Sequence, residues 1–164
     1  MKNNLSPQVT PELNNKIIDT INKISCEDEP GTIQVSENYD IKIEDENWKP
    51  NSPLVICPEW YSSILKSLPL SGLFFLAPEP EEKYMEEHEF LELTGWENVL
   101  EYYPFFIPDM VNSKHYPIAS SGYGYLVINH DSTPNDPIYR WDGSAMEYQK
   151  AFNSFSDLLD SIDN

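Results

Sequence analysis

Residues 116–162, YPIASSGYGYLVINHDSTPNDPIYRWDGSAMEYQKAFNSFSDLLDSI, predict two β-strands, a turn, a third strand and a capped helix. The run from Gly122 to Asn129 predicts a strand because apolar and aromatic residues dominate it. Successive side chains of a strand point to opposite faces. We therefore expect Leu126 and Ile128 to face the core and the alternate residues to face a partly covered surface.

A second alternating run follows a cluster of turn-forming residues. Asp131–Pro137 breaks the first pattern, and Ile138–Asp142 resumes it before Gly143. Within this strand Tyr139 and Trp141 share one face, and we expect Trp141 to lie in the core. The opposite face carries Arg140, the single arginine of the chain, which we expect to pair with Asp136 or Asp142 and to hold the turn.

The end of this region has the spacing of a helix capping box. The Ser154 hydroxyl is placed to accept an amide of the first helical turn, and Asp157 stands three residues later. The helix that follows carries its apolar residues on one face, namely Phe155, Leu158, Leu159 and Ile162. We expect this helix to seal the sheet.

Three short segments carry a resemblance to a known family. The order PIASSGYGY, PIYRWDG and SFSDLLDSI resembles the SUKH superfamily, over roughly residues 54–163. That family includes bacterial immunity proteins against polymorphic toxins and fungal regulators of cell-wall glucan synthesis. The resemblance implies an α+β fold, with an antiparallel or mixed sheet of four to six strands and helices on one side and at the edges. It implies no catalytic constellation.

The first 50 residues predict an N-terminal unit packed on the domain of residues 51–164. Residues 1–9 are expected to be a frayed leader. Thr10 and Pro11 then suit the cap and first position of a helix of about four turns. The apolar stripe of this helix consists of Leu13, Ile17, Ile18, Ile21 and Ile24. Two alternating runs, 32–36 and 39–43, predict a hairpin with Ile33 and Val35 opposite Ile41 and Ile43.

The middle of the chain predicts a helix and a buried strand. Pro58 begins a helical pattern that ends near Ser67, with Tyr61, Ile64, Leu65 and Leu68 directed inward. The continuous apolar run 73–76 predicts a strand. Residues 96–103 have helical spacing, and residues 102–108 form an aromatic stretch interrupted by two prolines.

The net charge of −18 constrains the partners of this protein. Such a field repels nucleic-acid phosphates and anionic membranes and attracts basic proteins, so we expect neither direct nucleic-acid binding nor membrane binding. The acidity is also compatible with a role in solubility alone, because net charge does not identify a specific partner. Both interpretations stay open.

The strongest acidic cluster lies between residues 78 and 101, which contain nine glutamates and the single Lys83. Aromatic residues interrupt it, and aromatic anchors inside a polar rim are typical of protein interfaces. We therefore predict a partner-binding surface. Its residues are Glu79, Glu81, Glu82, Tyr84, Glu86, Glu87, Glu89 and Phe90.

Other chemically suggestive residues favour structural interpretations. His88 lacks the second histidine of an HExxH motif, so no metal site is predicted. Residues 129–131, Asn-His-Asp, are better interpreted as a strand end entering a turn than as a catalytic dyad. Gly122 and Gly124 lack the third glycine of a dinucleotide loop and suit a bulge or a close backbone approach. No catalytic residue and no cofactor are predicted.

The remaining features indicate a cytoplasmic protein. Cys26 and Cys57 form no metal-binding or redox spacing, and we favour two reduced thiols over a disulfide. No leader with an apolar core precedes residue 12, and the longest apolar run is too short to span a bilayer. The sequence therefore predicts a non-enzymatic binding module whose partner is a basic protein such as a toxin domain, or alternatively a regulatory scaffold. Its oligomeric state stays open.

Overall fold

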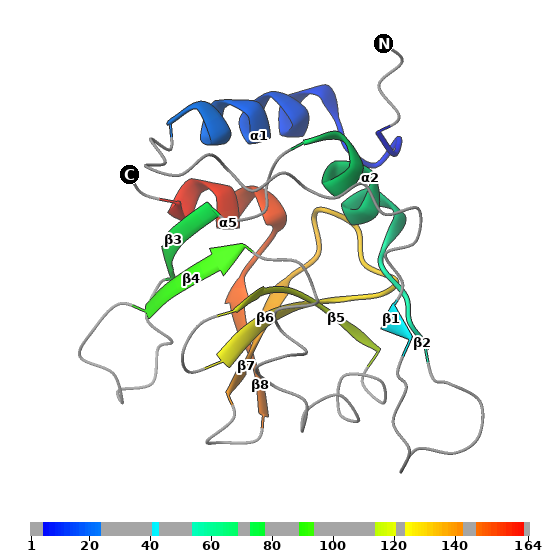
Figure 1. The fold of residues 1–164 in the computed structure, drawn as a ribbon, viewed down its shortest axis with the longest axis vertical. Helices are drawn as coiled ribbons and strands as arrows, with labels where there is room; N and C mark the ends of the chain where they lie inside the picture. The colour runs from blue at the N-terminus through cyan, green and yellow to red at the C-terminus, as the bar shows by residue number, and fades with distance from the viewer. Residues whose placement is uncertain are drawn as a thin grey trace.

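The computed structural model describes residues 5–23, 41–42, 54–68, 73–77, 89–93, 114–120, 124–142 and 147–162. Three helices and eight strands lie within these ranges (Figure 1). The helices are α1 (Pro11–Lys23), α2 (Glu59–Ser67) and α5 (Phe155–Ser161). The strands are β1 (Ile41–Lys42), β2 (Leu54–Val55), β3 (Leu73–Ala77), β4 (Glu89–Leu93), β5 (His115–Ser120), β6 (Gly124–Asn129), β7 (Ile138–Asp142) and β8 (Glu147–Phe152).

Strands β3 to β8 form one antiparallel sheet of six strands, in the order of the chain. The α+β class and the antiparallel sheet expected from the sequence are therefore confirmed. Each strand pairs with the strand next to it in sequence. Between β6 and β7, for example, Tyr125 lies opposite Trp141. This nearest-neighbour order keeps the connections local, which is the simplest way to build an antiparallel sheet.

Two irregularities change which residues reach the core. The β5–β6 register shifts between Pro117 and Ala119, so that Ile118 is an extra residue and both Ile118 and Ala119 are buried. The β7–β8 register shifts in the same way, because Ile138 pairs with Phe152 and Tyr139 with Lys150. An extra residue in one strand reverses the alternation of its side chains beyond that point.

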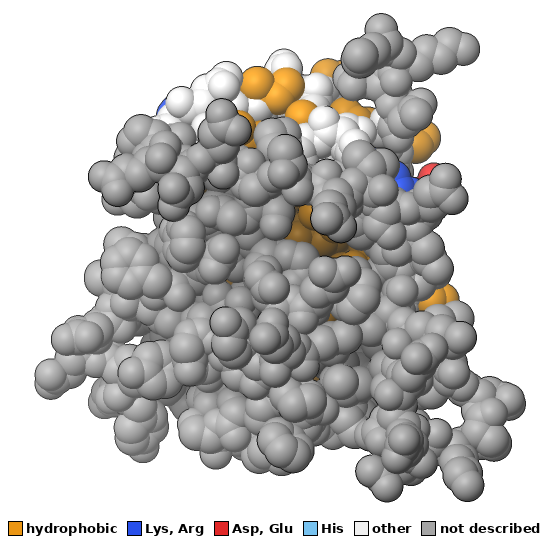
Figure 2. All heavy atoms as spheres, viewed as in Figure 1, with side chains coloured by type: hydrophobic (Ala, Val, Ile, Leu, Met, Phe, Trp, Pro, Cys, Tyr) orange, Lys and Arg blue, Asp and Glu red, His pale blue; other side chains and the backbone are white. Residues whose placement is uncertain are grey.

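The three helices lie together above the sheet in the view of Figure 1 and share one core with it. On the face shown in Figure 2, the described atoms lie mainly over this helical layer, where hydrophobic side chains (orange) lie among backbone atoms and other side chains (white). The core combines Ile17 of α1, Tyr61 of α2 and Phe155 of α5 with side chains from β5 to β8. Burial of this apolar surface is the main stabilising contribution.

The opposite face of the sheet is also buried near β6. Tyr125 and Val127 have no exposed surface and pack with Trp141 in a second cluster, against which Tyr139 and Tyr148 lie. The expectation that Leu126 and Ile128 face the main core is confirmed. The expectation of a partly covered second face is wrong at Tyr125 and Val127, where both faces of the central strand are closed to solvent.

Helix α1 begins as the sequence predicts but packs differently at two points. The Thr10 hydroxyl accepts the Leu13 amide at 3.2 Å, which satisfies a free donor of the first turn. Residues 5–9 are not a frayed leader, because the Ser6 amide donates to Ser63 Oγ at 3.0 Å and both serines are buried. Ile18, which the sequence placed in the apolar stripe, is 38% exposed, so that part of the prediction is wrong. The buried stripe is narrower than the sequence suggested, because Ile17 is fully buried while Leu13 and Ile21 are only partly buried against the core.

Helix α2 follows Pro58 and buries more than the sequence predicted. The predicted inward residues Tyr61, Ile64 and Leu65 are buried, and Trp60 joins them with 1% exposure. The Trp60 ring meets those of Tyr61 and Phe155 edge to face, at 5.6 Å and 5.3 Å between centroids. Desolvation, with a smaller contribution from Cys57, raises the pKa of Tyr61.

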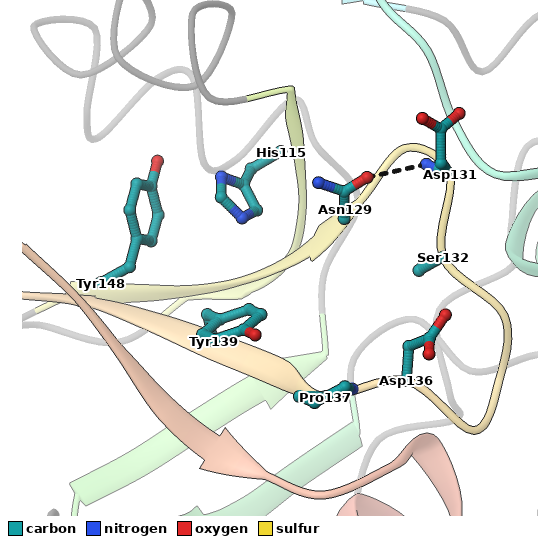
Figure 3. A pocket seen from close by; sticks show the side chains of 8 residues that line it. All are labelled: His115, Asn129, Asp131, Ser132, Asp136, Pro137, Tyr139 and Tyr148. Atoms are coloured by element: carbon teal, nitrogen blue, oxygen red, sulfur yellow. Dashed lines mark hydrogen bonds between the residues drawn. The ribbon is translucent and has the colours of Figure 1, made fainter.

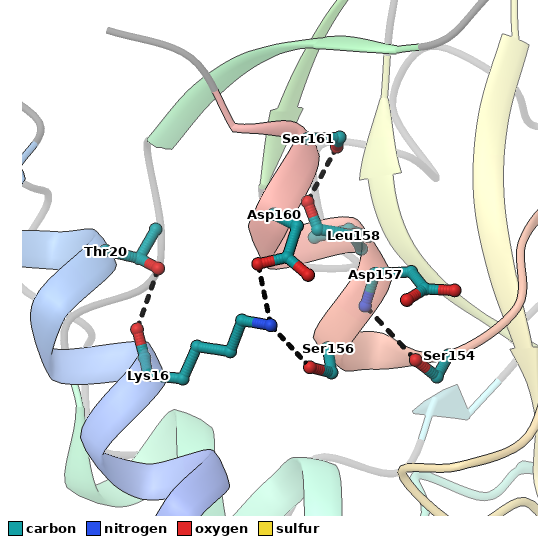
Figure 4. Close-up of polar contacts among 8 residues, drawn as sticks. All are labelled: Lys16, Thr20, Ser154, Ser156, Asp157, Leu158, Asp160 and Ser161. Carbon is teal, nitrogen blue, oxygen red and sulfur yellow. Dashed lines mark hydrogen bonds and ion pairs between the residues drawn. The ribbon is translucent and has the colours of Figure 1, made fainter.

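Helix α5 is capped as expected and is joined to α1. The Ser154 hydroxyl accepts the Asp157 amide at 3.1 Å, and the predicted face of Phe155, Leu158 and Leu159 is buried. Figure 4 shows Lys16 reaching from α1 to α5, where its Nζ lies 2.7 Å from both Ser156 Oγ and Asp160 Oδ1. These contacts lie at the surface, so they contribute little to the free energy of folding. They do define how α1 and α5 lie against each other.

Several sequence predictions fall on residues outside the described ranges. They include the run 32–36 of the N-terminal hairpin, Ile24, Cys26, Gly122 and the segments 96–103 and 102–108. Ile41 pairs with Val55, a pairing the sequence did not suggest. The division at residue 50 stays a prediction. Cys57 is buried in the main core, and no helix among the described residues is long and apolar enough to cross a membrane.

Candidate functional site

A pocket of about 440 Å³ lies at one end of the sheet, where β5, β6 and β7 meet the turn after β6 (Figure 3). The residues that line it come from three strands, from this turn and from β8. They are His115, Asn129, Asp131, Ser132, Asp136, Pro137, Tyr139 and Tyr148. A pocket of this size, with aromatic walls and several polar groups, is a candidate for a binding site.

Three rings form the wall on the strand side. The His115 ring lies against Tyr148 with 4.4 Å between centroids and a 33° tilt, and it meets Tyr139 nearly edge on at 5.9 Å. Tyr139 and Tyr148 lie on the face of the sheet opposite the helices, beside the Trp141 cluster. The sheet therefore holds this wall rigidly, since each ring comes from a different paired strand.

The wall on the other side is a turn that is closed by its own side chains. Asn129 Oδ1 accepts the Asp131 amide at 2.9 Å, and Asp136 Oδ2 accepts the Thr133 amide at 2.7 Å. This confirms the interpretation of residues 129–131 as a strand end entering a turn, because short polar side chains satisfy turn amides in this way. The turn places both carboxylates at the rim of the pocket.

The surroundings of His115 favour its neutral form. Desolvation lowers its pKa, and the neighbouring His130 lowers it further. Its Nδ1 atom is buried and has no hydrogen-bond partner in the described part of the chain. A neutral imidazole that carries its hydrogen on Nε2 presents a lone pair at Nδ1, so this atom can accept a donor.

His130 is held outside the pocket by its neighbours. Its Nε2 lies 3.0 Å from Asp131 Oδ1, and its Nδ1 lies 3.2 Å from the carbonyl oxygen of Lys114. Lys114 adopts a left-handed backbone conformation with φ of 58°, which is unusual for a residue with a Cβ. The His130 amide also donates to the Lys114 carbonyl at 2.9 Å, so these bonds hold the entrance to β5 in place.

Ser132 connects the pocket to the helical core. Its backbone oxygen accepts the indole Nε1 of Trp60 at 2.9 Å. Ser132 is 8% exposed and lines the pocket, and its Oγ has no hydrogen-bond partner among the described residues. Buried polar atoms are nearly always paired in folded proteins, so an unpaired hydroxyl in a pocket wall indicates a position for a ligand.

The arrangement is suited to binding. Aromatic rings provide contact area and two carboxylates provide negative charge. The unpaired acceptors can orient a ligand by hydrogen bonding. The Oγ of Ser132 makes no hydrogen bond to an imidazole, and no group of three or more histidine, cysteine or acidic residues that could hold a metal ion occurs in the described ranges. None of the described residues that line the pocket is a lysine or an arginine.

The predicted partner-binding residues are mostly not described by the structure. Glu79, Glu81, Glu82, Tyr84, Glu86 and Glu87 lie outside the described ranges. Glu89 and Phe90 belong to β4, a strand not predicted from the sequence, where they pair with Ala77 and Leu76 of β3. The structure therefore does not test this surface, which stays a prediction.

The structural residues singled out in the sequence, apart from Gly122, which lies outside the described ranges, are found in the sheet and at the start of α5. Trp141 is buried as expected, and Tyr139 shares its face. Gly124 begins β6, while the bulge nearby lies at Ile118 in the paired strand β5 instead. Arg140 is buried on β7, and its pairing with Asp136 or Asp142 stays a prediction.

Sequence reasoning missed most of the pocket. His115 and Tyr148 were not singled out, because nothing in a linear pattern brings residues 33 positions apart together. Ser132 was treated only as a turn former, and Asp136 only as a turn former and a possible partner of Arg140. The one available signal was the density of polar residues between β6 and β7, which also marks ordinary turns.

Comparison with known proteins found no relative from which to transfer a function. No protein-family model, curated protein or solved structure matches this chain. The charge of the chain and the geometry of the pocket therefore carry the argument about function.

Proposed function

We propose that this protein is a non-enzymatic, cytoplasmic binding module for a basic protein, and that its role is immunity against a toxin domain. The observation that carries the proposal is the pocket beside β7, in which Tyr139 and Tyr148 form an aromatic wall and Asp131 and Asp136 line the rim. Interfaces place aromatic anchors inside a polar rim, and these groups provide both.

The charge of the whole chain supports a basic partner. A net charge of −18 on 164 residues raises the rate at which a positively charged protein encounters this one, and the effect weakens with salt. Many toxins that act on nucleic acids carry positive sites for phosphate, and an acidic protein can occupy such a site in place of the nucleic acid. The partner class therefore follows from charge complementarity.

The resemblance of residues 54–163 to the SUKH superfamily also supports an immunity role. The family implies helices packed on an antiparallel sheet, and this chain has that general arrangement. The observation does not distinguish immunity proteins from the fungal regulators of the same superfamily. Regulation or scaffolding of a cellular enzyme is therefore the second candidate function.

Coexpression with the toxin encoded beside the gene tests the proposal. We expect a complex that survives pull-down at low salt and cells that survive toxin expression. Charge reversal at Glu81, Glu82, Glu86 and Glu87 should slow association and flatten its salt dependence. Absence of both complex and protection would reject the immunity role.

The neighbouring genes separate the two candidate functions. A large secreted protein with a C-terminal toxic domain encoded next to this gene favours immunity. A neighbourhood of cell-wall genes, with a cellular enzyme captured by the protein, favours the regulatory role.

A further inference from the structure

We propose that the pocket beside β7 receives an arginine side chain of the basic partner, with the guanidinium plane on the Tyr139 ring and its N–H groups directed at Asp136 and Ser132. This inference rests on the proposed function, because it names the chemical group by which the basic partner is held. It assigns to the pocket a ligand class that composition alone does not give.

The charges around the pocket favour a cation. Asp131 and Asp136 are the charged groups among the described residues that line it. Asp131 Oδ1 is already engaged with His130, and Asp136 Oδ2 with the Thr133 amide, which leaves one oxygen of each carboxylate for a ligand. Lys114, just before β5, and Lys150, in β8, are exposed and do not line the pocket.

The unpaired polar atoms favour a ligand with several donors. Ser132 Oγ and His115 Nδ1 are buried without a hydrogen-bond partner among the described residues, and both can accept. A guanidinium carries five N–H donors in a planar fork, whereas an ammonium is a compact, strongly hydrated charge. Several acceptors spread around one pocket therefore suit arginine better than lysine.

The aromatic wall and the neutral histidine complete the match. Guanidinium groups stack on aromatic faces, and Tyr139 and Tyr148 present rings to the pocket. Burial lowers the pKa of His115, so the imidazole does not place a competing positive charge in the pocket at pH 7. Below the pH at which His115 becomes protonated, the same residue would repel the ligand.

Titration with three synthetic pentapeptides, Gly-Gly-Xaa-Gly-Gly with arginine, lysine or citrulline at Xaa, tests the inference directly on the full chain. Nuclear magnetic resonance follows the side-chain signals of His115 and Tyr139. We expect saturable shifts with the arginine peptide, at least threefold weaker binding of the lysine peptide, and no saturation with citrulline. Equal shifts with arginine and citrulline would overturn the inference, because citrulline keeps the shape and loses the charge.

Two variants and one control assign the binding to this pocket. Asp136→Asn removes the charge while its amide oxygen can still accept the Thr133 amide, and it should weaken the arginine peptide at least threefold. Asp19→Asn changes the net charge equally on the exposed side of α1 and should leave binding unchanged. Tyr139→Phe should retain binding and Tyr139→Leu should lose it. Equal weakening by Asp136→Asn and Asp19→Asn would reduce the effect to net charge and reject the pocket.

Free L-arginine separates a protein partner from a small molecule. Tighter binding of free arginine than of the peptide would show that the pocket reads an amino acid, which overturns the assignment to a partner's side chain. The toxin complex gives a separate readout. A wild-type complex that Asp136→Asn and Tyr139→Leu leave intact would reject the inference and keep the proposed function, whereas absence of any wild-type complex rejects the function itself.

Discussion

Replacing Trp60 with phenylalanine should loosen both the core and the pocket. The indole Nε1 donates to the Ser132 carbonyl at 2.9 Å, and this bond ties α2 to the turn that carries Ser132 and Asp136. The ring itself is 1% exposed and lies 5.3 Å from Phe155. Phenylalanine keeps an aromatic ring in place but removes the donor, so a buried carbonyl loses its partner.

The expected cost has two parts. Leaving a buried acceptor without its donor costs about 1–3 kcal/mol. Contracting the indole to a phenyl ring leaves a small void beside Phe155 and Tyr61, which adds about 1–2 kcal/mol. We therefore expect the free energy of unfolding to fall by about 2–5 kcal/mol. For a chain of 164 residues each kcal/mol lowers the Tm by about 2–4 °C.

Urea unfolding followed by far-ultraviolet circular dichroism measures this loss, since the variant removes one of four tryptophans and would distort a fluorescence signal. Amide exchange adds a local readout, because the Ser132 and Asp136 amides are bonded within the turn at 3.0 Å and 3.1 Å. The protection of these two amides against exchange should fall by more than the loss of global stability alone would cause. A stability change below about 0.5 kcal/mol, the size typical of surface substitutions, would refute the assigned role of Trp60.

Three further substitutions test the fold and its pH response. Ser154→Ala should destabilise the chain by about 1 kcal/mol through loss of the α5 cap, and Ser154→Asp should restore most of it in urea unfolding. Ile17→Ala should cost about 2–4 kcal/mol, whereas Ile18→Ala should change stability by less than about 0.5 kcal/mol, which thermal unfolding of the matched pair will show. The folded-state pKa of His115 is lowered, so below about pH 6.5 the unfolded chain binds a proton that the folded chain does not, and stability falls as the pH falls. His115→Gln should flatten that part of the profile of unfolding free energy against pH.

The local signals in the sequence predicted the elements that depend on local chemistry. Thr10 and Ser154 cap their helices because a hydroxyl one residue before a helix accepts a free amide wherever the helix then packs. Strands β6 and β7 were predicted because their alternation is uninterrupted. The α+β class was implied by the family resemblance, and these elements are compatible with it.

Strands β4 and β8 were missed because their local sequence patterns do not indicate strands. In β8 the extra residue near Ala151 lets Tyr148 face one cluster and Phe152 the other, although the two are four positions apart. A strict two-residue period would place both on one face, so the pattern looked irregular. Strand β4 was missed because Glu89-Phe-Leu-Glu-Leu93 lies among glutamates, which are uncommon in strands.

The pocket was beyond sequence reasoning for a similar reason. His115 and Asn129 are opposite each other only because β5 and β6 pair in that register, and Tyr148 reaches the His115 ring only through β7 and β8. Linear spacing contains none of these relations. Sequence reasoning identified the turn at 129–136 and explained its polar residues by turn chemistry. The structure confirms the turn, and it shows in addition that several of these residues line the pocket.

The two faces of the sheet therefore differ in what they pack against. The face beneath the helices carries the main core, and the opposite face carries the aromatic cluster of Tyr125, Val127 and Trp141 with the pocket at its edge. A strand bulge allows β8 to contribute to both faces, and Trp60 joins the core to the pocket wall. A ligand in the pocket would therefore contact side chains whose positions are fixed by packing against these two clusters. Little side-chain entropy would be lost on binding, which is the condition under which a small, charged contact contributes to affinity.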